Sequence, residues 1–142
     1  MYISDAKRLT TEGARKIKNA AVKAAETAGI PITVAVVDAG GHLLVLERMD
    51  GGKFHSVHSA TTKAVCAASN KRNTGSTGAV GQSLDVLHAL GLALAAGPER
   101  WTAMEGGCPI MVGNECIGGV GVAGGNWEFD EKVAREAVDA IK

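Results

Sequence analysis

The chain has 142 residues, 46% of them hydrophobic, and 15 Lys and Arg balance 15 Asp and Glu, so its formal net charge is zero. This length fits one domain with a sizeable core, whereas the balanced charge and only two Phe, two Trp and one Tyr argue against a nucleic-acid partner. Charges begin at Asp5 and no apolar run approaches the roughly 20 residues of a membrane helix, so we predict a cytoplasmic protein without a membrane partner.

The first predicted element is a helix. Apolar and small residues recur at helical spacing between residues 6 and 28. Ser4 is expected to cap the start of this helix, and Gly29 with Pro31 to end it.

A hairpin follows in the stretch VAVVDAGGHLLVLERMDGG, residues 34–52. Two β-rich runs joined by a short glycine-containing loop are typical of a hairpin, and we place its strands at 32–37 and 42–47. The second strand then opens into a short charged loop that includes Arg48 and Asp50.

Two helices are expected next, at about 54–70 and 83–95. Between them lies the most loop-like part of the chain, residues 73–81, with the sequence NTGSTGAVG. Gly97-Pro98 is expected to end the second of these helices.

Three strands are expected in the last third of the chain, at 100–105, 109–112 and 115–122. Gly113-Asn114 suits a type II′ turn between the last two strands, which would place Cys116 opposite Met111. A final helix follows, capped by Asn126 and carrying acidic residues in its first turn, where the helix dipole favours them.

The predicted fold class is α+β, with residues 1–142 as a single domain. Short connections make the sheet antiparallel, and apolar strands on both sides of the pleat require helices on both faces. The three cysteines, Cys66, Cys108 and Cys116, have no CxxC spacing, which predicts reduced thiols rather than a disulfide framework or a zinc site.

Several motifs resemble the GlcG/HbpS-like haem-degrading family, which also forms the C-terminal domain of PduO-type corrinoid adenosyltransferases. The matching pieces, in the family's order, are VAVVDAGGHL at 34–43, RMDG at 48–51, Lys63-Ala64, GGCPI at 106–110, IGGVGVAGG at 117–125 and Asp130-Glu131. The resemblance implies a profilin-like, five-stranded antiparallel sheet between helices, a homo-oligomer, and binding or breakdown of haem or a related tetrapyrrole.

His55 and His58 are the candidate metal ligands, for haem iron. They are three residues apart at the start of a predicted helix and therefore share a face. Imidazole is a common ligand of iron. The alternative is that both are solvated or capping side chains, because no HExxH pattern accompanies them. His42 and His88 are assigned structural roles.

Arg48, Asp50 and Lys63 are candidate ligand-binding residues, because the carboxylates of a tetrapyrrole need cations and Arg binds a carboxylate with two hydrogen bonds. The alternative for the first two is an ordinary Arg48–Asp50 ion pair. Met49 is included as a soft iron ligand, although a Met beside a hairpin also serves as core filler.

Glu105, Gly106 and Gly107 complete the candidate binding residues. Their backbone N–H groups suit an anion nest, or the glycines simply make a sharp bend before a strand. The GxGxxG pattern at 119–124 lacks the following parallel strand of a dinucleotide site, so its glycines are expected to permit close helix–strand packing.

Three functions stay open, and whether the protein is an enzyme stays open with them. The first is binding of a small ligand, haem or a corrinoid, with slow haem degradation. The second is an accessory protein or enzyme acting on a small metabolite or cobalamin in a glycolate, diol or glycerol pathway. The third is a structural oligomer without a ligand. Small-residue helix faces predict a homo-oligomer, a dimer or larger, in each case.

Overall fold

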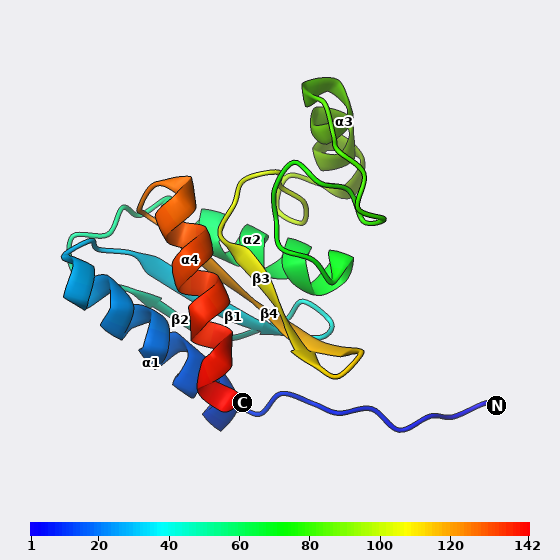
Figure 1. The fold of residues 1–142 in the computed structure, drawn as a ribbon, viewed down its shortest axis with the longest axis horizontal. Coiled ribbons are helices and arrows are strands. Elements are labelled where there is room, and N and C mark those ends of the chain that lie inside the picture. Colours follow the sequence, from blue (N-terminus) through cyan, green and yellow to red (C-terminus); the bar gives the residue numbers. More distant parts are fainter.

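The structure, a computed structural model that describes residues 1–142, has a four-stranded sheet and helices on both of its faces (Figure 1). It confirms the α+β class. The helices are α1 (Thr11–Ala28), α2 (Ser56–Asn70), α3 (Val86–Ala96) and α4 (Trp127–Ala137), the last continued by a 3-10 turn at Val138–Ile141. The strands are β1 (Thr33–Asp38), β2 (Leu43–Arg48), β3 (Gly107–Val112) and β4 (Glu115–Ala123).

The sheet is antiparallel throughout and has the strand order β2-β1-β4-β3, so the two predicted hairpins lie side by side. Strand β1 pairs with β4 from Thr33 opposite Ala123 to Asp38 opposite Gly118. In the second hairpin Met111 lies opposite Cys116, as predicted. Gly113 has a φ of 61° and Asn114 has no positive φ, which is the pattern of a type II′ turn.

Helices α1 and α4 pack together on one face of the sheet, and α2 covers the other (Figure 1). The larger core lies under α1 and α4 and is built from side chains such as Ile17, Val34 and Val120, all fully buried. A smaller, alanine-rich core lies under α2. Helix α3 projects away from this body, and none of its residues is buried.

The predicted strand at 100–105 is wrong, and the sheet has four strands instead of five for this reason. The backbone N–H of Trp101 donates to Gly97 O at 3.2 Å, and that of Met104 donates to Thr102 Oγ1 at 3.0 Å. These local hydrogen bonds use the donors that a strand would offer to a neighbour. The indole of Trp101 is buried. The likeness to profilin stays a prediction.

The predicted cap of the first helix is also wrong. Thr10 caps α1, because its Oγ1 accepts a hydrogen bond from the backbone N–H of Gly13 at 3.1 Å. The helix begins only after Leu9, the first side chain of the chain to reach the core, whereas Ser4 lies in the exposed segment before it. Asn126 caps α4 as predicted, accepting from the N–H of Phe129 at 2.8 Å.

Glycines on β4 allow α2 to approach the sheet closely. A Cβ atom on Gly119 would collide with the carbonyl oxygen of Ala64, and one on Gly121 with that of Ala60. The alanines that face them on α2 are fully buried. The GxGxxG pattern thus serves close helix–strand packing, as expected from its sequence context.

All three cysteines are free, with Cys66 and Cys108 buried and Cys116 partly exposed. Burial raises the pKa of the Cys108 thiol to about 11. No helix of the structure combines the length and the apolar character that a membrane crossing needs.

We predict that Gly121→Ala destabilises the fold by about 1–3 kcal/mol, because the added methyl group forces α2 away from β4. The measurement is the free energy of unfolding by urea. Gly91→Ala on α3 is the matched control, since a Cβ there meets nothing within 4 Å and Ala favours a helix over Gly. Equal stability of Gly121→Ala and the unsubstituted protein would contradict this packing argument.

Candidate functional site

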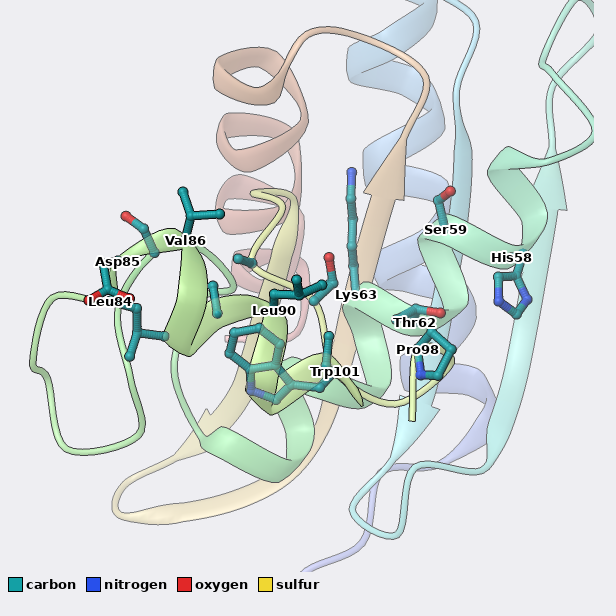
Figure 2. A pocket seen from close by; sticks show the side chains of 15 residues that line it. His58, Ser59, Thr62, Lys63, Leu84, Asp85, Val86, Leu90, Pro98 and Trp101 are labelled. Carbon is teal, nitrogen blue, oxygen red and sulfur yellow. The ribbon is translucent and has the colours of Figure 1, made fainter. Parts of the chain in front are cut away.

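Two cavities open on the side of the protein where α2 begins. The first has a volume of about 570 Å³ and lies between α2 and the segment that holds α3 and the loop after it (Figure 2). Its apolar wall comes from that segment and includes Leu84, Leu90 and Trp101. Figure 2 shows Leu90 beside the indole of Trp101, with His58 at the far edge of the lining beyond Thr62.

The polar groups of this first cavity come from α2 and from Ser76, Asp85 and Thr102 outside it. His58 is exposed at its edge, and Ser59 and Thr62 follow on the same helix. The Oγ1 atom of Thr62 is buried and has no hydrogen-bond partner within the protein. Such an unpaired buried hydroxyl is costly to the folded state.

The second cavity has a volume of about 370 Å³ and lies between the start of α2, the loop before β3 and the start of α4. Its lining includes His55, Glu105 and Asp130. Ser59 and Lys63 line both cavities. The stem of Lys63 therefore separates an apolar space from a strongly polar one.

A buried ion pair lies at the inner end of the second cavity. The Nζ atom of Lys63 is 3.4 Å from Asp130 Oδ2 and donates a hydrogen bond to the backbone oxygen of Val122 at 2.9 Å. The side chains of Lys63 and Asp130 are 8% and 4% exposed. Burial lowers the pKa of Lys63 and raises the pKa of Asp130, although each charge opposes that shift in its partner.

Backbone geometry holds Asp130 in place. Its Oδ1 accepts a hydrogen bond from the N–H of Gly125 at 2.9 Å, just before α4. Gly106 has a φ of 122°, and a Cβ there would lie 2.9 Å from Lys63 Nζ and 3.1 Å from Asp130 Cβ. This glycine therefore leaves the room that the pair occupies.

The structure brings several of the predicted site residues together. His55 and Glu105 line the second cavity, His58 lines the first, and Lys63 lines both. His55 and His58 start the same helix, yet they belong to different cavities. The N–H of Gly107 already donates to Thr74 Oγ1 at 2.8 Å, so it is used within the protein.

Three predicted residues lie elsewhere. Arg48, Met49 and Asp50 follow β2 and line neither of the two cavities. Met49 packs against the larger core, and Arg48 and Asp50 form no ion pair with each other. Their role as ligand-binding residues stays a prediction.

Sequence reasoning did not single out Trp101 or Thr62. The signal for Trp101 was its large apolar side chain, which is usually mostly buried. Thr62 lies four residues after His58, which places both on one face of a helix. No group of three or more His, Cys, Asp or Glu is arranged to hold a metal ion by itself.

Comparison with known proteins gives a consistent result. A family model described as haem degrading protein HbpS-like matches residues 9–139. The chain is 30% identical over 133 residues to an uncharacterized 15.0 kDa protein from the dhaT-dhaS intergenic region of Citrobacter freundii, covering 94% of this chain and 92% of that one. A solved complex of PduOC with haem has a TM-score of 0.84 and 29% identity, with 96% of each chain covered.

The chain is also 31% identical over 126 residues to the corrinoid adenosyltransferase PduO of Salmonella typhimurium. The match covers 89% of this chain but only 37% of that enzyme.

We predict that Asp130→Asn lowers the free energy of unfolding by roughly 3 kcal/mol, because it leaves Lys63 buried without an opposite charge. The double variant Lys63→Met/Asp130→Asn should recover much of that loss, since it removes both buried charges. Urea unfolding of the three proteins measures both effects. A double variant no more stable than Asp130→Asn would show that the buried charge is not the cause.

Proposed function

Because the chain belongs to the family of HbpS-like haem-degrading proteins, we propose that it binds haem or a related tetrapyrrole in the first cavity. The binding unit is the single domain of residues 1–142. The observation behind this placement is the cavity itself, whose volume of about 570 Å³ lies within the usual range for ligand sites. The haem complex of the similar PduOC structure supports the choice of ligand.

The residues of the first cavity fit such a group. A tetrapyrrole needs an apolar slot, and the wall of Leu84, Leu90 and Trp101 supplies one. It also needs a donor for the metal, and His58 is the only imidazole in this lining. Ser59 adds a partly exposed hydroxyl-bearing residue to the lining.

His58 would hold the iron, and Trp101 with Leu90 would exclude water from one face of the ring. When bound, haem would supply a redox-active iron. His55 lies at the other cavity, whose lining includes the charged residues Lys53, Lys63, Glu105 and Asp130. We therefore assign the iron to His58 rather than to both histidines.

A corrinoid is the second candidate ligand, because of the similarity to part of the adenosyltransferase PduO. The same apolar cavity would have to hold a larger and more polar molecule. The two ligands are separated by testing both under the same conditions.

We predict that the protein gives a sharp, saturating Soret band when it is titrated with haemin, and that His58→Ala weakens binding about tenfold or more and shifts the band. His55→Ala is the matched control and should bind as the unsubstituted protein does. Quenching of Trp101 fluorescence provides an independent measure, with Trp101→Phe showing which of the two tryptophans reports. Cobalamin is titrated in parallel.

A broad band that never saturates would contradict haem binding at a defined site. An unchanged titration of His58→Ala would remove this residue as the ligand. Saturable binding of cobalamin alone would favour the corrinoid.

We also propose that a second copy of the chain covers α3, which makes the protein a homo-oligomer. Five large apolar side chains of this helix are between 39% and 84% exposed: Val86, Leu87, Leu90, Leu92 and Leu94. A helix that is apolar all round is normally buried, and an apolar patch of several hundred Å² marks an interaction site. Its only titratable side chain is His88, so a partner with the same apolar surface suits it.

We predict that Leu87→Glu combined with Leu94→Glu converts the oligomer to a monomer in light scattering at micromolar concentration. Neither side chain lines the first cavity, so the change acts on the outer surface of α3. Val80→Glu is the control, because Val80 is an equally exposed apolar residue outside the helix. A monomer before any substitution would contradict the proposal.

A further inference from the structure

Lys63 places an ammonium group at the wall of the second cavity with an incomplete set of partners. An ammonium has three N–H donors, whereas Lys63 Nζ has two acceptors within the protein, Val122 O at 2.9 Å and Asp130 Oδ2 at 3.4 Å. The second distance is longer than the 2.7–2.9 Å of a strong charge-assisted hydrogen bond. Figure 2 shows the side chain running along the first cavity with its nitrogen directed away from Trp101.

The surroundings of this ion pair lower the energetic cost of its proton-transferred, uncharged form. Burial is the largest influence on both groups, and it lowers the pKa of Lys63 while it raises the pKa of Asp130. Transfer of one proton from the ammonium to the carboxylate removes both buried charges. The result is a neutral amine, which is a nucleophile, beside a carboxylic acid, which can protonate a leaving oxygen.

Lys63 and Asp130 both line the second cavity, although their side chains are only 8% and 4% exposed. Gly106 has no side chain where a Cβ would lie 2.9 Å from Nζ, and Lys63 is part of the lining of this space of about 370 Å³. Glu105 from the loop before β3, and Lys53 and His55 from the approach to α2, are the other titratable groups that face it. The space admits a small carbonyl compound, and Lys53 and His55 can face a carboxylate on it while Glu105 and Asp130 line the rest.

The geometry points to a carbonyl-binding site in which Lys63 captures a small aldehyde as a Schiff base, with Asp130 as the acid. The amine nitrogen attacks the carbonyl carbon and forms a C–N bond. Asp130 then gives its proton to the hydroxyl group of this adduct, which leaves as water when the C–O bond breaks. The products are a protonated imine on Lys63, the Asp130 carboxylate and one water molecule, with no oxidation or reduction.

This reactivity requires no iron, and Asp130 lines only the second cavity, so it can be tested without a tetrapyrrole. If the Lys63–Asp130 pair served only to stabilise the fold, the cavity beside it would have no function. The 3.4 Å between Lys63 Nζ and Asp130 Oδ2 is also long for a stabilising ion pair. A buried ion pair offsets the cost of desolvation only when its atoms are close and well oriented.

The test is reductive trapping of the full chain, without haem, by glyoxylate and cyanoborohydride at pH 6.5. Glyoxylate is an aldehyde with a carboxylate, and acetaldehyde is its neutral counterpart. We expect one carboxymethyl group per chain in the intact mass, located on Lys63 by peptide mapping. Labelling of Lys63 should exceed that of any exposed lysine, because its lowered pKa raises the fraction of neutral amine.

Three substitutions distinguish a reactive Lys63 from one that only stabilises the fold. Lys63→Arg keeps the charge and should lose the label, whereas Lys53→Arg, at the opening of the same cavity, should keep it. Asp130→Asn should slow trapping at Lys63 while the label still appears there. Peptide mapping of the unsubstituted protein decides the question even if a variant fails to fold. An unmodified Lys63 beside labelled surface lysines or a labelled N-terminus would overturn the proposal.

Discussion

The close contact between α2 and β4 is the constraint on which the rest of the structure depends. Helix α2 can lie this near the sheet only because Gly119 and Gly121 present no side chain to it. The alanines of the helix fit against those glycines, and together they form the smaller core. Since small side chains bury little area each, the contact depends on closeness rather than on bulk, which makes it sensitive to a single methyl group.

The same contact determines where the functional groups lie. With α2 fixed against β4, the Lys63 nitrogen reaches the end of that strand and meets Val122 and Asp130. One turn earlier, Ser59 borders both cavities, and His58 reaches the edge of the larger one. One helix therefore supplies polar groups to two spaces of different character, an apolar slot and a small polar pocket.

Local patterns in the sequence were sufficient for most of the fold. The helical period and the turn residues located all four helices and both hairpins, although Thr10 rather than Ser4 caps the first helix, because each of these signals depends on neighbours within a few positions. The strand at 100–105 failed, since the choice between ladder and local hydrogen bonds there depends on the burial of Trp101. In the site, Lys63 and Glu105 were found from motifs. Which cavity each of them lines depends on contacts with segments that are distant in the sequence. Arg48 and Asp50 are adjacent to the hairpin in sequence but lie away from both cavities.

Helix α3 belongs at once to the wall of the larger cavity and to the exposed apolar surface of the protein. Its position is fixed by no buried side chain of its own. The proposed ligand and the proposed partner copy would contact the same helix from two sides. Binding on one side that orders α3 would then favour binding on the other, and such a linkage is reciprocal. The affinity for the ligand would then depend on the protein concentration.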